Sequence, residues 1–124
     1  MNVVDTSGWL EYFADTVNAK NFENAILDTE NLLVPVVVIY EVFKKVLNEF
    51  NEDKALTVIG HMKMGKVINI DEDIAINAAK ISAAKKMPMA DSLIYSIALK
   101  HTAIIYTQDS HFENLEFVKY FNKE

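Results

Sequence analysis

Residues 1–13, MNVVDTSGWLEYF, indicate which class of fold the chain can adopt. The two valines form a short apolar run that is typical of a buried strand, and apolar residues at helical spacing begin a few residues later. The strand ends on an acid, Asp5, and two hydroxyl side chains, Thr6 and Ser7, follow it. A strand that passes directly into a helix favours an α/β fold, and here it places a carboxylate at the tip of the first strand.

The rest of the chain repeats this alternation of strands and helices. Strands are predicted over residues 2–5, 31–37, 66–70, 102–107 and 116–121. Helices are predicted over 7–14, 18–30, 36–50, 52–64, 71–86 and 88–101, with a short helical turn over 109–115. This order predicts a three-layer α/β/α sandwich with a central parallel sheet of four or five strands. No linker or internal repeat interrupts the pattern, so we expect a single domain over residues 1–124.

The composition excludes several classes of protein. The 124 residues are 51% apolar, which is enough for one core, and they include no cysteine for a disulfide or a thiolate metal site. No segment resembles a signal peptide, and the longest apolar run, LLVPVVVIY at 32–40, is too short to span a bilayer. We therefore expect a cytoplasmic protein that does not contact a membrane.

The charge of the chain argues against a broad basic surface for nucleic acid. The formal net charge is −6, and all 12 basic residues are lysines. Arginine clamps on phosphate are therefore impossible, so a phosphate contact must use lysine, backbone N–H groups, hydroxyls or a cation. An enzyme that holds a few phosphates through a bound metal remains compatible with this charge.

Four acids lie just after a predicted strand or early in the helix that follows one: Asp5, Glu41, Asp91 and Asp109. Each has an ordinary explanation when it is taken alone. Asp5 and Asp109 suit helix caps. Asp91 suits the first helical turn after Pro88, and Glu41 suits an ion pair with the lysine four residues later.

The four acids are harder to explain together. The carboxyl ends of parallel strands meet at one edge of the sheet, so all four carboxylates would point to the same end. Two carboxylates about 4 Å apart repel by roughly 4 kcal/mol at an effective dielectric constant near 20, and a bound cation removes this cost. Oxygen donors without cysteine or an obvious histidine suit Mg²⁺ or Mn²⁺ rather than Zn²⁺.

Other candidate residues have structural explanations. Three glycines are too few for a phosphate-binding or dinucleotide-binding loop, so no residue is predicted to bind an organic cofactor. The acids at 71–73 suit a helix N-terminus. The histidines are interpreted as surface residues rather than metal ligands; they are His61, His101 and His111.

Four blocks of the sequence resemble those of a known family. They are VVDTSGWLEYF (3–13), VVIYEVFKK (37–45), MPMADSLIYSIALKH (87–101) and AIIYTQDSHF (103–112). In this order and at these spacings they resemble the acidic blocks of PIN-domain ribonucleases, most closely the VapC-type toxins of toxin–antitoxin pairs. The resemblance covers nearly the whole chain, and it implies a PIN-like fold in which helices flank a parallel sheet.

The resemblance also implies a function. It implies a nuclease, a metal-dependent ribonuclease that hydrolyses RNA phosphodiester bonds with Mg²⁺ or Mn²⁺, with water as the attacking group and a 5′-phosphate product. It further implies a cognate antitoxin protein as an inhibitory partner, and a homodimer. The residues that match the family's metal-binding and catalytic acids are Asp5, Glu41, Asp91 and Asp109, and the supporting polar residues beside them are Ser7 and Thr107.

The chain departs from the family pattern at two places. Many relatives carry a further acid two residues after the last one, where this chain has His111. Many also carry arginine around the site, where this chain has Lys44, Lys45, Lys85 and Lys86. Because of the first departure, the sequence does not show whether the site has a ligand for a second metal ion. Because of the second, it does not show which residues contact the substrate.

Three other classes of protein share part of the pattern. A haloacid-dehalogenase-type phosphatase needs a second acid two residues after the first, where this chain has Ser7. A receiver domain could use Asp71 as its phospho-acceptor, but it needs a lysine after a late strand, where this chain has YTQD. A non-catalytic interaction module, in which the acids serve only as caps, is the alternative from outside the enzymes. Binding of Mn²⁺ would separate that module from a nuclease.

Overall fold

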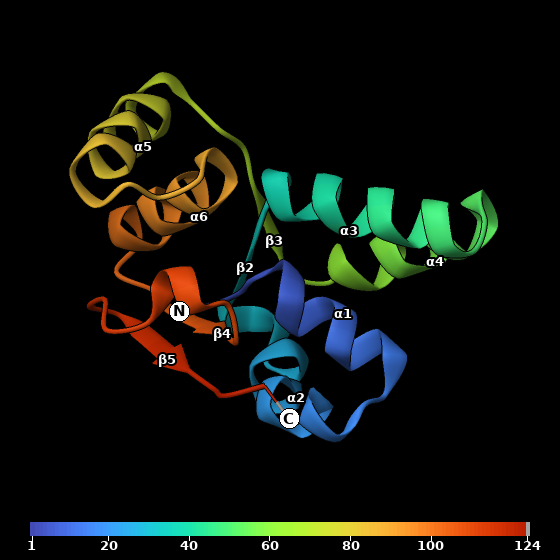
Figure 1. Ribbon diagram of the computed structural model, residues 1–124. Coiled ribbons are helices and arrows are strands. Elements are labelled where there is room, and N and C mark those ends of the chain that lie inside the picture. The colour runs from blue at the N-terminus through green and yellow to red at the C-terminus, as the bar shows by residue number, and fades with distance from the viewer. Residues whose placement is uncertain (124) are drawn as a thin grey trace.

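Five short strands form the centre of the structure, a computed structural model that describes residues 1–123 (Figure 1). The strands are β1 (Asn2–Val4), β2 (Leu32–Pro35), β3 (Lys66–Ile68), β4 (Ile104–Thr107) and β5 (Val118–Tyr120). Their order across the sheet is β3-β2-β1-β4-β5, and every neighbouring pair is parallel. The predicted α/β class with a central parallel sheet is confirmed.

Helices connect the strands and cover both sides of the sheet. The α-helices are α1 (Thr6–Ala14), α2 (Lys20–Leu27), α3 (Val36–Glu49), α4 (Glu52–Met62), α5 (Glu72–Lys85) and α6 (Met89–Lys100). Three short 3-10 turns are η1 (Val17–Ala19), η2 (Thr29–Asn31) and η3 (Ser110–Phe112). In Figure 1, α5 and α6 lie on one side of the line of strands and α2 lies on the other, which gives the three layers of the predicted sandwich. Within residues 1–123, none of the helices has the length and apolar character needed to cross a bilayer.

The element boundaries differ from the predicted ones where local backbone geometry decides them. The strand predicted over 31–37 stops at Pro35, whose extended backbone, with ψ of 136°, forms the N-cap of α3. The segment predicted as one helix over 18–30 instead holds η1, α2 and η2, and α2 ends where Asp28 leaves the helical region with ψ of 68°.

The core lies around β1, the middle strand of the sheet, and its two neighbours β2 and β4. Burial on both faces is expected where helices cover a parallel sheet. The side chains with no exposed surface include Val3, Val4, Leu33 and Val34. Residues 94–98 of α6 are also buried, as their nearly continuous apolar sequence predicts. This burial fixes the first turn of α6, which carries an acid, against the rest of the fold.

A glycine allows α1 to pack closely on β1. Gly8 is buried, and a Cβ atom at this position would lie 2.6 Å from both the Phe22 Cδ1 and the Val4 Cγ1 atoms. No larger residue fits this space without movement of the core. The close approach brings the first backbone N–H groups of α1 to the end of β1.

Candidate metal centre and active site

The four acids singled out in the sequence come together at the carboxyl end of the sheet. They line one pocket of about 250 Å³. The pocket residues are Asp5, Thr6, Ser7, Leu10, Glu41, Asp91, Ile94 and Asp109. The pocket lies where the strand order changes direction, because β1 is flanked by β2 on one side and by β4 on the other. Ligand sites of open α/β sheets form at this switch point.

Asp5 is the most buried of the four acids, with 3% of its surface exposed. Its Oδ1 accepts hydrogen bonds from the Ser7 hydroxyl at 2.7 Å and the Gly8 N–H at 3.1 Å. Its Oδ2 accepts a hydrogen bond from the Thr107 hydroxyl at 2.6 Å. Burial raises the pKa of Asp5 to about 6, the three hydrogen bonds act in the opposite direction, and the charge of Asp109 adds to the increase. Asp5 therefore caps α1 and also belongs to the acidic pocket.

Glu41 reaches the pocket from the second turn of α3. The Thr6 hydroxyl donates a hydrogen bond to Glu41 Oε1 at 2.5 Å, which connects the start of α1 to α3. The sequence suggested an ion pair between Glu41 and Lys45, and the described residues do not form this pair. Lys45 instead pairs with Glu49, at 2.9 Å between Nζ and Oε1. The carboxylate of Glu41 is therefore available to the pocket.

Asp91 lies in the first turn of α6, and 14% of its side chain is exposed. Burial raises the pKa of Asp91 to about 7. The negative charge of Asp109 adds to this increase, His111 opposes it, and the charges of Asp5 and Glu41 contribute further. The four carboxylates therefore share one environment in which like charges repel.

Asp109 follows β4 and caps η3. Its Oδ1 accepts a hydrogen bond from the His111 N–H at 2.9 Å. Its own N–H donates to the Thr107 hydroxyl oxygen at 2.9 Å, and the same hydroxyl donates to Asp5. Thr107 is fully buried and thus links Asp5 to Asp109. The capping interpretation and the grouping of the acids both hold for Asp109.

His111 lies closer to the acids than the sequence analysis predicts. Its side chain is 54% exposed, as expected for a surface residue, yet Nδ1 lies 2.9 Å from Asp91 Oδ2 and 3.0 Å from Asp109 Oδ1. The three residues offer ligand atoms that all lie within 4.8 Å of one another. The signal that could have identified His111 is its place two residues after the last acid, within the same short turn.

A buried amide pair, which the sequence analysis missed, holds the loop that carries Asp109. Asn18 Nδ2 donates a hydrogen bond to Gln108 Oε1 at 2.9 Å, and both residues are almost fully buried. The Gln108 N–H also faces the Ser7 hydroxyl oxygen at 3.5 Å. Asn18 and Gln108 are 90 residues apart, so no local sequence pattern could have paired them.

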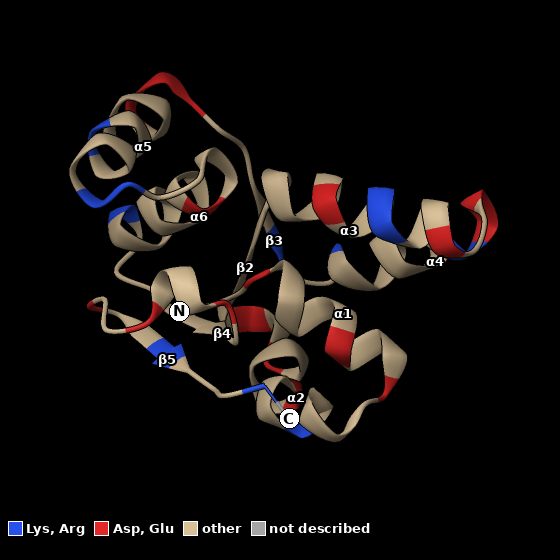
Figure 2. Ribbon diagram, viewed as in Figure 1, with Lys and Arg blue, Asp and Glu red and all other residues tan. Residues whose placement is uncertain are grey.

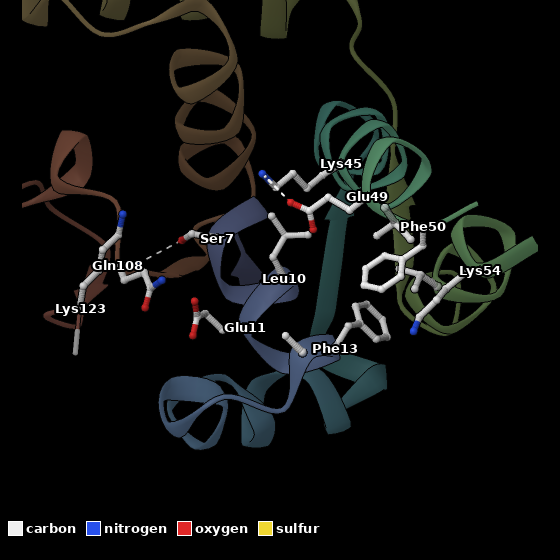
Figure 3. Close-up of a pocket in the computed structure, with 13 residues that line it drawn as sticks. Ser7, Leu10, Glu11, Phe13, Lys45, Glu49, Phe50, Lys54, Gln108 and Lys123 are labelled. Atoms are coloured by element: carbon white, nitrogen blue, oxygen red, sulfur yellow. Dashed lines mark hydrogen bonds and ion pairs between the residues drawn. The ribbon is translucent and has the colours of Figure 1, made fainter. Parts of the chain in front are cut away.

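A larger pocket of about 720 Å³ lies beside the acidic one and shares Ser7 and Leu10 with it (Figure 3). It lies between α1 and the pair formed by α3 and α4. The rings of Phe13 and Phe50 form part of its wall. Its charged residues are Glu11, Lys45, Glu49, Lys54 and Lys123. The pocket therefore combines apolar surface with charges of both signs.

The basic residues are distributed differently from the acids. Figure 2 shows lysines on α3, α4, α5, α6 and β5 rather than gathered in one group. This distribution agrees with the sequence-based exclusion of a broad basic surface in the view shown.

The donor set of the acidic pocket fits a hard divalent cation. Four carboxylates supply oxygen ligands of the kind that Mg²⁺ and Mn²⁺ take in proteins. The raised pKa values of Asp5 and Asp91 reflect burial and mutual repulsion, both of which a bound cation would offset. Among the described residues, Asp91 and Asp109 lie close enough to share an ion, together with His111. Asp5 and Glu41 line the same pocket, so the residues that could hold a metal there are Asp5, Glu41, Asp91 and Asp109.

The fold and the pocket define an α/β protein with carboxylates at the switch point of a parallel sheet. The sequence model of the PIN domain matches residues 3–118. Because this match spans nearly the whole chain, the chain belongs to the PIN domain family. The family resemblance drawn from the four sequence blocks is thereby confirmed. No curated protein matches the sequence.

Solved structures of toxin–antitoxin proteins share the fold. The toxin–antitoxin complex from Klebsiella pneumoniae has a TM-score of 0.82 at 17% identity, over 99% of this chain and 100% of that one. DNA-bound VapBC from Salmonella typhimurium has a TM-score of 0.76 at 18% identity, over 98% of each chain. VapC20 of Mycobacterium tuberculosis, a sarcin–ricin loop cleaving toxin, has a TM-score of 0.77 at 14% identity, over 95% of this chain and 97% of that one. At these identities the likeness establishes a common fold.

Proposed function

We propose that the chain is a divalent-metal-dependent ribonuclease that hydrolyses RNA phosphodiester bonds and acts as the toxin of a toxin–antitoxin pair. The observation that carries the proposal is the convergence of four carboxylates, from four separate parts of the chain, on one pocket at the switch point of the sheet. Membership of the PIN domain family and the likeness to VapBC complexes and to a toxin that cleaves the sarcin–ricin loop support it.

We propose that the acids of the pocket hold Mg²⁺ or Mn²⁺ and are the catalytic residues. A divalent ion lowers the pKa of a bound water and stabilises negative charge on phosphate oxygens. The proposed ligands are Asp5, Glu41, Asp91 and Asp109, and the proposed supporting residues are Ser7 and Thr107. No cysteine is available as a nucleophile, which agrees with attack by water.

The neighbouring side chains orient the proposed ligands. Ser7 and Thr107 each hold a different oxygen of Asp5, so this carboxylate cannot rotate freely. Thr6 fixes one oxygen of Glu41. These hydrogen bonds pre-form the site, and such outer contacts tune both the position and the basicity of metal ligands.

The direct test compares purified wild-type protein with Asp5→Asn and Asp91→Asn on cellular RNA, with Mg²⁺ or with EDTA, followed by sequencing of the RNA ends. Wild type should cut at defined positions only with the metal, and both variants should lose cleavage by about 10²-fold or more, because each loses a charged ligand. Asp71→Asn is the matched control. Asp71 caps α5 and pairs with Lys100, it is not among the residues that line the acidic pocket, and asparagine caps a helix equally well.

If Asp5→Asn cleaved RNA as fast as the wild-type protein, the proposed mechanism would be refuted. A protein that neither cuts RNA nor binds Mn²⁺ would instead be the non-catalytic interaction module.

We further propose an antitoxin protein as partner and a homodimer as the assembly. The matching solved structures include toxin–antitoxin complexes, and the 720 Å³ pocket beside the acids offers apolar and charged surface for a partner segment. Size-exclusion chromatography with light scattering tests the dimer, and co-expression with the neighbouring reading frame tests the partner. A monomer at all concentrations would contradict the homodimer.

A further inference from the structure

A histidine side chain faces two of the proposed metal ligands at hydrogen-bond distance. His111 Nδ1 lies 2.9 Å from Asp91 Oδ2 and 3.0 Å from Asp109 Oδ1. The nitrogen and the two carboxylates offer ligand atoms within 4.8 Å of one another, a spacing that suits a shared cation. The pocket therefore has a nitrogen donor at its edge as well as oxygen donors.

The backbone of His111 is held in place by its turn. The His111 N–H donates to Asp109 Oδ1 at 2.9 Å, and the Phe112 N–H donates to the Asp109 carbonyl oxygen at 3.1 Å. The Phe112 side chain is fully buried and anchors η3 in the core. The backbone of His111 is thus held on both sides, whereas its side chain remains half-exposed and accessible to ions in solution.

We infer that His111 is a ligand of the metal centre and that its nitrogen makes this centre select Mn²⁺ over Mg²⁺. This inference rests on the proposed function, because it takes the acidic pocket as a metal centre. Mg²⁺ takes oxygen ligands in near-ideal octahedral geometry and gains little from an imidazole. First-row transition ions accept imidazole together with carboxylates, so a mixed donor set shifts the choice towards them.

The competing explanation is that His111 is only a counter-charge for Asp91 and Asp109. A counter-charge would be displaced when a cation enters, and its nitrogen would not contact the metal. The two explanations therefore differ in a property that can be measured directly, the presence of nitrogen in the coordination shell of bound Mn²⁺.

The experiment uses the full chain, freed of metal with EDTA and then loaded with MnCl₂ or MgCl₂. Pulsed electron paramagnetic resonance detects coupling between bound Mn²⁺ and the imidazole nitrogen, and calorimetry gives the affinity for each ion. The variant His111→Asp makes the donor set all-oxygen, and His111→Ala removes the donor. His61→Ala is the matched control, because His61 is exposed on α4, away from the acids.

Wild type and His61→Ala should show nitrogen coupling, and both His111 variants should lose it. The ratio of Mn²⁺ to Mg²⁺ affinity should fall at least about tenfold in His111→Asp. Removing a residue that only supports a metal ligand already lowers metal affinity by about 10- to 100-fold, and His111 is inferred to be a ligand itself. Because His111 is half-exposed, neither substitution should unfold the chain, and far-ultraviolet circular dichroism checks this.

The inference and the proposed function fail in different ways. Bound Mn²⁺ without nitrogen coupling, or an unchanged affinity ratio in His111→Asp, would overturn the inference while RNA cleavage could persist. Nitrogen-coupled Mn²⁺ in a protein that leaves RNA intact would uphold the inference and refute the nuclease. A protein that binds neither ion would refute both.

Discussion

Asp5 shows how one carboxylate can serve local structure and a shared site at once. A cap needs only one oxygen, and here Oδ1 accepts from Ser7 and Gly8 at the start of α1. The second oxygen is free to reach across to β4, where it accepts from Thr107. One oxygen therefore caps α1 while the other holds Asp5 to β4, and together they fix this carboxylate at the pocket.

At the scale of single residues, we predict that Thr107→Val weakens metal binding without dismantling the fold. The hydroxyl of Thr107 donates to Asp5 and accepts from the Asp109 N–H, so its loss releases two proposed ligands together. The affinity for Mn²⁺ should fall about 10- to 100-fold, and the free energy of unfolding should fall by about 1–3 kcal/mol because buried polar groups lose partners.

Calorimetry and urea unfolding measure the two effects of Thr107→Val. Thr57→Val is the control, because the Thr57 hydroxyl donates to the Asp53 carbonyl oxygen within α4 and Thr57 does not line the acidic pocket. An affinity equal to that of wild type would show that Thr107 has no role in the site.

At the scale of elements, the packing of α1 on β1 depends on the absence of a side chain at residue 8. We predict that Gly8→Ala lowers the free energy of unfolding by about 1–3 kcal/mol, the usual cost of overpacking a core. The added methyl would lie 2.6 Å from atoms of the buried residues Phe22 and Val4. Metal affinity should fall as well, because the Gly8 N–H also holds Asp5.

The matched control for Gly8→Ala is Gly60→Ala. Gly60 lies within α4, and nothing lies within 4 Å of the Cβ that alanine would add. The free energy of unfolding of Gly60→Ala should rise by about 0.5–1 kcal/mol, because alanine has a higher helix propensity than glycine. Urea unfolding compares the two proteins, and a Gly8→Ala variant as stable as wild type would contradict the close packing of α1 on β1.

The elements themselves could be predicted from sequence because their signals are local. Apolar runs gave the strands, helical spacing gave the helices, and Pro35 marked the boundary between β2 and α3. The break between α2 and η2 could not be predicted, because it depends on the backbone angles of Asp28, and no glycine or proline lies beside this residue to signal it.

At the scale of the whole molecule, the acids raise the stability of the metal-free protein at low pH. The pKa is about 6 for Asp5 and about 7 for Asp91 in the folded chain, against an ordinary value of 3.8. At these two groups the folded state therefore binds more protons than the unfolded state, and their contribution to stability falls as pH rises from about 4 to about 7. The pKa of Asp71, which hydrogen bonds from the Ile74 N–H and Lys100 lower, contributes in the opposite direction. For Asp5 alone the loss is roughly 3 kcal/mol, at about 1.4 kcal/mol per pKa unit.

Thermal unfolding in EDTA across this pH range measures the effect. The comparison is between His111→Ala and the double variant His111→Ala, Asp91→Asn. Both proteins lack the imidazole, so their difference reports the titration of Asp91, which Asp109 and Glu41 still face. The double variant should lose less stability as pH rises, and saturating Mn²⁺ should reverse the trend in wild type. Equal pH slopes for the two proteins would contradict the assignment.

The convergence of the acids could be predicted only in outline. Parallel strands place their carboxyl ends together, so one end of the sheet was expected to carry all four. The order β3-β2-β1-β4-β5, which sets Asp5 beside Asp109, depends on long-range packing that one sequence does not reveal. The contact of Thr6 with Glu41 and the pairing of Asn18 with Gln108 depend on that same packing.

The scattered lysines set how an RNA strand would approach the proposed site. Three lysines line the pocket that adjoins the acids, Lys45, Lys54 and Lys123, so an RNA strand that crosses both pockets would meet a small number of lysines and release few counterions. The affinity for RNA should therefore fall only slightly as ionic strength rises, whereas it falls steeply for proteins that bind the phosphate backbone through a basic surface.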